Sequence, residues 1–206
     1  MTLRAPDPAS FIKRRKQLLA WMHSQGGGIA VIGTAPERAR NRDNHYAYRH
    51  DSDFYYLTGF TQPNAWLVLL AGKDDQAILF CEPKHPELEI WNGLRWGPEQ
   101  AAKQFCFDQA HDCDRIDEVM PDLMTGHANL MTTMSRPSDD GMFGLLRNWV
   151  KQASAKTRGA RACPHNWLDL SEVLAEMRLI KDPGELEIMR RAANISAQGH
   201  VRAMQT

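Results

Sequence analysis

The chain has 206 residues, and its 25 lysines and arginines are balanced by 25 aspartates and glutamates. This balance argues against a dedicated DNA- or RNA-binding protein, which usually carries a basic excess. Hydrophobic residues make up 43% of the sequence, which excludes an intrinsically disordered chain and is enough for a packed core. The length corresponds to about 1.4 typical domains and therefore predicts one core of ordinary size with an additional segment.

The charges are unevenly distributed along the neutral chain. Residues 1–50 carry nine basic and three acidic side chains, residues 51–125 carry five and fourteen, and residues 126–206 carry eleven and eight. We interpret the acidic middle as a solvated face, with an interface as the alternative.

Targeting signals are not evident in the sequence. No apolar run reaches the roughly 18 residues of a transmembrane helix, and no apolar segment or cleavage site follows the charged N-terminal stretch. The four cysteines are irregularly spaced, which predicts reduced thiols and a cytoplasmic protein. Cys106, His111 and Cys113 offer three soft metal ligands, but a structural zinc site would need a fourth.

The first half of the chain predicts one helix and several strands. Ser10 is expected to cap a helix to Ser24 whose buried face excludes Arg14, Arg15 and Lys16. Three glycines at 26–28 precede a strand rather than follow one, which favours a turn over a phosphate-binding loop. The further elements expected here are a strand at 29–32, a polar loop at 36–53, a strand at 55–58 ended by Gly59, and hairpin strands at 66–71 and 76–81.

The second half alternates helices and strands. Apolar and polar residues alternate at 88–91, which favours a strand or sheet edge. Ser138 is expected to cap a helix to about Ala155 that buries Met142, Leu145, Leu146, Trp149 and Val150. The other expected elements are helices at 98–105, 115–124 and 171–180 and a strand at 130–134. This mixture predicts an α/β or mixed α+β fold.

The last segment opens with a strong helix-start signal, in which Asp182, Pro183 and Glu185 form a capping box with proline at the first position. The helix that follows places Leu186, Met189, Ala193 and Ser196 on one face, and its pattern runs to Thr206 without a stop. We therefore expect a truncated chain, in which this apolar face has no partner.

Three motifs resemble one family. Residues 48–60 read YRHDSDFYYLTGF, and residues 63–70 read PNAWLVLL. Together they resemble the aminopeptidase P N-terminal domain pattern YR-x-x-SDF-x-Y-x-TGF-x-x-P-x-A. The run EIWNG at 89–93, followed by Arg95, is similar to a second motif of bacterial members. The run EMRLIKDPGEL at 176–186 is similar to the junction that leads into the metallopeptidase domain of Xaa-Pro aminopeptidases.

The resemblance implies a mixed sheet flanked by helices, like ribonuclease H, over residues 1–175. Residues 176–206 would then be a linker and the first helix of a pita-bread metallopeptidase domain beyond Thr206. That domain would hold two divalent metal ions, usually manganese, and would hydrolyse the peptide bond before a proline in second position. The chain itself would hold no metal ligand and no catalytic residue.

The resemblance also implies two site residues in this chain. Trp91 would form a wall of the substrate pocket, and Asp43 would approach that pocket, in both cases in a neighbouring subunit of a dimer or tetramer. An aromatic wall suits the apolar proline ring. The alternatives are an ordinary core or interface tryptophan and a loop-capping aspartate.

The motif residues at 48–59 are expected to be structural, with Arg49 and Asp53 tying the loop to the following strand and with the tyrosines packing. The residues concerned are Tyr48, Arg49, Asp51, Asp53, Tyr55 and Gly59. A catalytic cluster is the alternative for Tyr48, Arg49, Asp51, Asp53 and Tyr55. The neighbouring His45 and His50, beside the aspartates at 43, 51 and 53, could form a metal site, although their spacing defines no coordination geometry.

Two other functions remain open at this point. Prolidases and creatinases share the architecture, with poorer agreement in the motifs. A stand-alone ribonuclease H-like scaffold that ends at Thr206 would belong to a different class. The acidic middle and basic flanks, which could mediate self-association, motivate that scaffold.

Overall fold

The computed structural model describes residues 7–134, 141–157 and 163–205. The chain forms two compact units, Met1–Glu172 and Val173–Thr206. No helix in the described ranges is long and apolar enough to cross a lipid bilayer.

A six-stranded sheet forms the centre of the first unit, in the order β6-β5-β4-β1-β7-β8. The central strands β1, β4 and β5 are antiparallel, whereas the outer pairs β5–β6, β1–β7 and β7–β8 are parallel. The predicted mixed sheet is therefore confirmed. The strands are β1 (Gly28–Gly33), β4 (Trp66–Ala71), β5 (Gln76–Cys81), β6 (Gln109–Asp112), β7 (Asn129–Thr132) and β8 (Asn166–Asp169).

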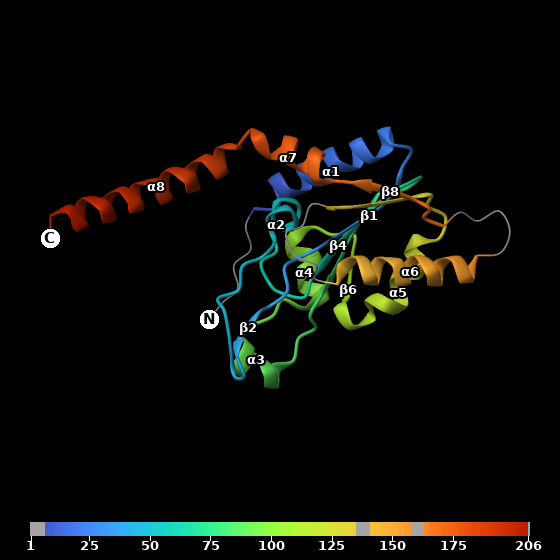
Figure 1. The fold of residues 1–206 in the computed structure, drawn as a ribbon, viewed down its shortest axis with the longest axis horizontal. Coiled ribbons are helices and arrows are strands. Elements are labelled where there is room, and N and C mark those ends of the chain that lie inside the picture. The colour runs from blue at the N-terminus through green and yellow to red at the C-terminus, as the bar shows by residue number, and fades with distance from the viewer. Residues whose placement is uncertain (1–6, 135–140, 158–162, 206) are drawn as a thin grey trace. The chain divides into compact units, whose positions relative to one another are not determined.

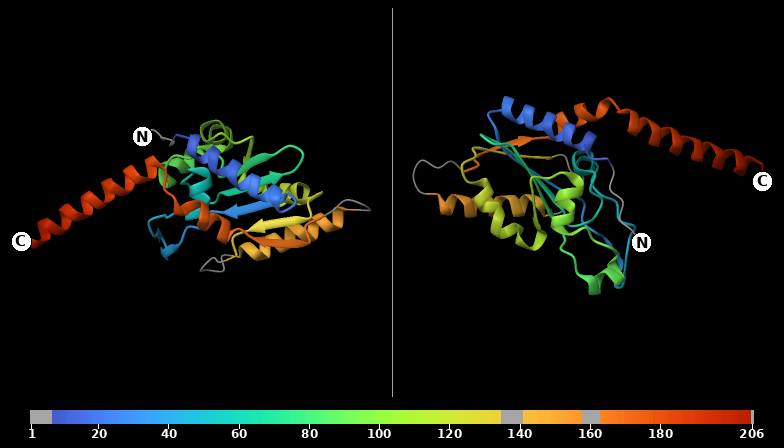
Figure 2. Two further views of the ribbon diagram at one scale, coloured as in Figure 1. Left: turned by 90° about the horizontal axis from the view of Figure 1, so that it is seen from above. Right: turned by 180° about the vertical axis from the view of Figure 1, so that it is seen from behind.

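Helices cover both faces of this sheet. Helices α5 and α6 contribute to the core on one face, and α1 lies on the other side with α2 and α4 (Figures 1 and 2). A separate hairpin, β2 (Ala39–Asn41) with β3 (Asn44–His45), projects from the unit. The helices are α1 (Ala9–Ser24), α2 (Ser52–Thr58), α3 (Pro86–Asn92), α4 (Gly97–Phe105), the short 3-10 helix η1 (Cys113–Arg115), α5 (Ile116–Met124) and α6 (Met142–Lys156).

Apart from Gln76 at the start of β5, the central strands are apolar, as is typical of strands that are buried on both faces. On one face they pack on methionines from α5 and on Trp149 of α6. The ring of Trp149 meets Trp66 edge to face at 5.6 Å, and its Nε1 donates to Asp117 at 2.5 Å. The indole N–H is therefore satisfied although the side chain is fully buried.

The glycine turn joins α1 to β1, as the sequence predicts. Gly28 has a φ of 138°, and a Cβ there would stand 2.6 Å from the carbonyl oxygen of Asn129 in β7. The side-chain amide of Asn129 donates to the carbonyl of Gly27 at 2.9 Å. Glycine is needed here because two backbones approach more closely than any side chain allows.

The predicted strand at 55–58 is wrong, because these residues lie in helix α2. The carboxylate of Asp51 accepts the backbone N–H groups of Asp53 and Phe54, each at 2.9 Å, and so caps the helix. Gly59, with a φ of 68°, ends it in the left-handed conformation. The β-favouring tyrosines are overridden by a cap at one end and a glycine at the other.

The predicted strand at 88–91 is also wrong, since it forms helix α3. Pro86 occupies the first turn, where it costs no hydrogen bond, and Gly93 with a φ of 76° ends the helix. Ser10 is not the cap of α1, because the helix already begins at Ala9. The strands β6 and β8 were not predicted, because they are four-residue edge strands with polar sequences.

Other predicted elements are confirmed within a few residues, namely α4, α5, β7 and α6. In α6, Met142, Leu146 and Trp149 are buried as expected, Val150 is half-buried, and Leu145 is exposed. The predicted cap Ser138 lies outside the described residues.

The second unit consists of most of α7 (Ser171–Leu179) and all of α8 (Pro183–Met204). The capping box is formed as predicted: Asp182 accepts the N–H of Glu185 at 2.8 Å, and Glu185 accepts the N–H of Asp182 at 2.9 Å. No residue of α8 is buried, so Leu186, Met189 and Ala193 are all exposed, as expected.

Two arginines of α1 are buried, contrary to the expectation that they point away from the packed face. Arg15 is only 3% exposed, and its guanidinium donates to the carbonyls of Leu57, Phe105 and Cys106 at 3.1, 3.0 and 2.7 Å. Arg14 donates to the carbonyl of Tyr56 at 3.1 Å. Burial lowers the pKa of Arg15 to about 10, and the nearby Cys106 and Asp108 oppose this effect. These bonds join α1 to the ends of α2 and α4.

We expect Arg15→Met to lower the free energy of unfolding of the 206-residue chain by roughly 3 kcal/mol, because three carbonyls lose a charged donor. Urea unfolding followed by circular dichroism would measure it. Lys16→Met, at the adjacent exposed position, is the matched control and should change the value by less than about 0.5 kcal/mol. Equal losses in the two variants would contradict the assigned role of Arg15.

Candidate functional site

The candidate site lies at one end of the strands of the sheet, not beside an edge strand. The parallel strands β5 and β6 end there, and the antiparallel strand β4 begins there. The segments attached to these strand ends, at 61–65, 82–96 and 113–115, therefore meet at this end of the sheet. Between them is a pocket of about 260 Å³, lined by Asn64, Glu82, Pro83, His85, Leu88, Glu89, Gly93, Arg95, Cys113 and Asp114.

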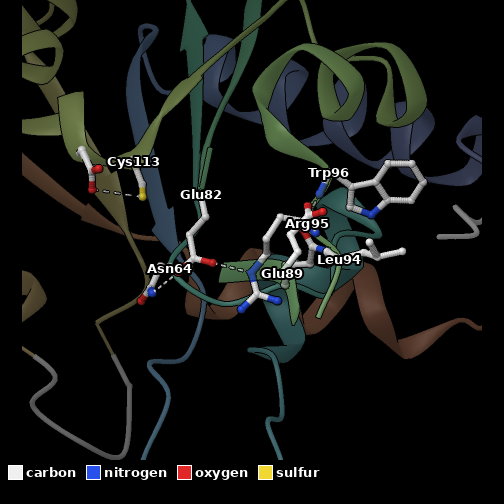
Figure 3. Close-up of polar contacts among 9 residues, drawn as sticks. Asn64, Glu82, Glu89, Leu94, Arg95, Trp96 and Cys113 are labelled. Atoms are coloured by element: carbon white, nitrogen blue, oxygen red, sulfur yellow. Dashed lines mark hydrogen bonds and ion pairs between the residues drawn. The ribbon is translucent and has the colours of Figure 1, made fainter. Parts of the chain in front are cut away.

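Glu82 is the centre of a polar network at this pocket (Figure 3). One carboxylate oxygen accepts Nε of Arg95 at 2.5 Å, and the other accepts Nδ2 of Asn64 at 2.7 Å. The side chains of Arg95 and Glu82 are only 15% and 26% exposed. Because solvent screens this ion pair little, it constrains the chain more than a surface pair would.

The network fastens the segment that carries α3. The backbone N–H of Arg95 donates to Glu89 at 2.9 Å, which joins the helix to the residues that follow it. Gln62 donates to the carbonyl of Leu94 at 2.8 Å and accepts the N–H of Trp96 at 3.0 Å. The segment that follows α3 is thus bonded both to the loop before β4, through Gln62, and to the end of β5, through Glu82.

Trp91 lies on α3 and is 85% exposed, and its neighbour Ile90 is 81% exposed. Leu88 and Leu94 add further exposed apolar surface to the same segment. Trp91 is therefore no core residue of this chain. An apolar patch this well held and this exposed is typical of a surface that binds a partner or a ligand.

Asp43 lies at the tip of the β2–β3 hairpin and is exposed. Asn41 pairs with Asn44, so Arg42 and Asp43 form the two-residue turn between them. The N–H of Asp43 donates to Oδ1 of Asn41 at 3.1 Å. Part of the expected loop at 36–53 is thus a hairpin, and it projects at the same end of the first unit as α3 (Figure 1).

Tyr48 closes the loop that follows the hairpin. Its hydroxyl lies 2.8 Å from Oγ1 of Thr34 and donates to the carbonyl of Ala35 at 3.0 Å. Oγ1 of Thr34 also accepts the N–H of Asp51 at 3.3 Å. Burial raises the pKa of Tyr48, against the opposing effect of the hydrogen bond with Thr34.

The other motif residues contact neighbouring backbone and rings. Arg49 donates to the carbonyl of His50 and to Oγ of Ser52. The ring of Tyr55 stacks on His50 at 4.5 Å and meets Phe11 edge to face at 5.8 Å. Burial lowers the pKa of His50, an effect that Arg49 strengthens and Asp51 opposes.

Within the part of the chain that the structure describes, no group of three or more His, Cys, Asp or Glu side chains is arranged to hold a metal ion. His111 packs against the ring of Phe80 at 5.3 Å. Burial raises the pKa of Cys113 to about 11, and the nearby Asp114 and Glu82 strengthen this effect.

The fold is that of a class of domains found at the N-terminal end of solved aminopeptidases. It superimposes on the structure of Pseudomonas aeruginosa aminopeptidase PepP with a TM-score of 0.90 and 34% identity, covering 99% of this chain and 46% of that one. The family model for the aminopeptidase P N-terminal domain matches residues 11–131. The chain therefore belongs to the aminopeptidase P N-terminal domain family.

Further relatives agree with this assignment. The Xaa-Pro aminopeptidases of Haemophilus influenzae and Escherichia coli K12 are each 35% identical over 95% of this chain. The chain spans 42% and 44% of those relatives, less than half their length. It also matches zinc-substituted E. coli aminopeptidase P in complex with product, with a TM-score of 0.87, 29% identity and coverage of 98% of this chain and 46% of that one.

Sequence reasoning missed the network around Glu82. Gln62 and Asn64 flank the motif proline, and Glu82 directly follows an apolar strand, which is where a polar residue tends to mark a site. The position of Glu82 directly after this strand is the sequence feature that could have indicated the site. The partners themselves are 13 to 34 residues apart in sequence, so no local pattern connects them.

We expect Glu82→Ala to lower the free energy of unfolding by about 2 kcal/mol and to speed proteolysis within residues 82–96, because Arg95 and Asn64 lose a shared acceptor. Urea titration and limited trypsinolysis would measure these effects. Glu99→Ala removes an ion pair whose partners are 84% and 72% exposed, so it serves as the control and should cost less than about 0.5 kcal/mol. Similar behaviour of the two variants would contradict the role of Glu82.

Proposed function

We propose that this chain is the non-catalytic N-terminal domain of an Xaa-Pro aminopeptidase, an enzyme that removes an N-terminal residue preceding proline. The observation that carries the proposal is Trp91, an almost fully exposed tryptophan on a helix that polar bonds hold in place. The two relatives at 35% identity are both Xaa-Pro aminopeptidases, which favours this assignment over a prolidase or a stand-alone scaffold.

In this proposal, Trp91 forms one wall of a proline pocket in a neighbouring subunit. A proline ring offers a large apolar surface, which an indole face covers well. Holding the helix rigid lowers the entropy that binding would otherwise cost. Asp43, at the hairpin tip, approaches the same pocket from a second projection of the domain.

The proposed domain comprises residues 1–175, and residues 176–206 form a linker and the first helix of a metallopeptidase domain. The compact unit that ends at Glu172 and the helix start at Asp182 support this division. The exposed apolar side chains of α8 would pack within that following domain.

The proposed enzyme uses two divalent metal ions, and in this proposal the following domain holds both of them. Similarity to a zinc-substituted aminopeptidase supports a metal requirement, and we propose manganese as the ion. Two such ions supply an activated water and polarise the scissile carbonyl. The contribution that we propose for residues 1–175 is to shape the substrate pocket.

Its partners would be the following catalytic domain, further copies of the same chain in a dimer or tetramer, and a peptide with proline in second position. The exposed apolar patch on α3 supports contact between subunits. All four cysteines are free, which is consistent with the cytoplasmic location that we propose.

The 206-residue chain with manganese is expected not to hydrolyse an Xaa-Pro peptide, whereas the full-length protein with its metallopeptidase half is expected to do so. Release of the first amino acid, measured by chromatography, compares the two. Hydrolysis by the short chain at the rate of the full-length protein would overturn the non-catalytic assignment. A gene with no metallopeptidase segment in frame after Thr206 would overturn the proposed parent enzyme.

In the full-length protein, Trp91→Ala is expected to lower kcat/KM by roughly 30-fold, since truncating an anchoring tryptophan typically costs about 2 kcal/mol. Ile90→Ala alters an equally exposed neighbour on the same helix and should lower it less than about threefold. Mixed oligomers of Trp91→Ala with a metal-free variant test whether the residue acts across subunits. Recovered activity is expected, and its absence would show that Trp91 acts within its own subunit or only structurally.

A further inference from the structure

The β2–β3 hairpin carries a concentration of positive charge that the proposed function does not yet explain. Three arginines, Arg38, Arg40 and Arg42, alternate along five residues, and Asp43 is the one acidic residue between 38 and 45. At about 3.5 Å per residue, the three Cα atoms span at most roughly 14 Å. The Cα atoms of neighbouring arginines in this row are at most about 7 Å apart, within the screening length of about 8 Å in physiological salt, so the charges of these arginines add to one positive field.

The hairpin geometry displays these side chains. Ala39 pairs with His45 and Asn41 with Asn44, so Arg40 is the extra residue of a β-bulge. A bulge redirects the side chain at that position and interrupts regular pairing. Arg42 occupies the turn itself, next to Asp43. All residues of the hairpin are exposed.

Arg40 and Arg42 make no side-chain hydrogen bond or ion pair with any residue in the ranges 7–134, 141–157 and 163–205. An isolated two-stranded hairpin is only marginally stable, and repulsion between neighbouring guanidinium groups weakens it further. A binding partner with negative charge would remove that repulsion. The hairpin therefore has the electrostatic character of a recognition element.

We propose that this basic hairpin makes the enzyme favour peptides that carry aspartate or glutamate beyond the proline. The inference rests on the proposed function, in which Asp43 at the hairpin tip borders the peptide pocket. Arg42 directly precedes that residue and Arg40 lies three positions before it, so the part of a peptide that extends past the proline would enter their field. Carboxylates on this part of the peptide gain attraction, and lysines are repelled.

An acidic peptide fits this surface better than a nucleic acid does. A nucleic-acid site needs several cations along a backbone, usually with aromatic side chains for stacking or a positive domain. This chain is neutral overall, and its residues 51–125 carry nine more acidic than basic side chains. The hairpin itself carries only three arginines, which suits one or two carboxylates.

The test compares three amidated peptides with the full-length protein: Ala-Pro-Gly-Glu-Glu, Ala-Pro-Gly-Gln-Gln and Ala-Pro-Gly-Lys-Lys. An exposed charge pair changes an equilibrium about 1.4- to 5-fold, so two arginines should give the glutamate peptide roughly a tenfold advantage in kcat/KM over the lysine peptide at low salt. In 0.5 M salt the ratio should fall to about twofold.

Variants assign the effect to the hairpin. The double variant R40S/R42S should bring the glutamate-to-lysine ratio close to 1, whereas R40K/R42K should retain most of it because the charge is kept. The charge-matched control R147S/K151S alters two exposed cations on α6 and should leave the ratio unchanged.

A parent ratio near 1 at low salt, or an unchanged ratio in R40S/R42S, would overturn the inference. So would salt-sensitive binding of a short oligonucleotide, lost in R40S/R42S, in the absence of peptide selectivity. If the full-length protein hydrolyses none of the three peptides, that result contradicts the proposed function instead. The failure of the inference and the failure of the proposed function are therefore distinguishable.

Discussion

Burial of the central strands on both faces is the constraint from which the rest of the structure follows. Because helices cover β1, β4 and β5 on each side, functional side chains can lie only at the ends of these strands or on the segments attached to those ends. The network around Glu82 lies at such an end, and both Trp91 and Asp43 are on projecting segments. The same burial makes the sheet a rigid base for them.

Much of the fold could be predicted from the sequence where one local signal dominates. The apolar runs of β1, β4 and β5 and the capping box at Asp182 are such signals. Residues 55–58 predict a strand because tyrosine favours strands, but they form a helix because the side chain of Asp51 caps its start. The burial of Arg15 could not be predicted, because its carbonyl partners lie up to 91 residues away in sequence and come close only in the folded chain.

The site was accessible to sequence reasoning only in part. The family motifs point to Trp91 and Asp43 as the proposed pocket residues, whereas periodicity alone predicts a strand at Trp91. The bonds of Gln62, Asn64 and Glu82 join segments from three different strand ends, so they depend on the topology of the sheet. The bulge at Arg40 likewise depends on strand pairing that a polar sequence does not reveal.

Gly28 lies at the contact between β1 and β7, which joins two parts of the sheet. Its missing side chain lets the backbone of β1 approach β7, while the candidate site depends on β4, β5 and β6 on the other side of β1. A Cβ at this position would collide with the backbone of Asn129, so any larger residue would have to displace β7 relative to β1. The contact between β1 and β7 thus depends on the absence of a single side chain.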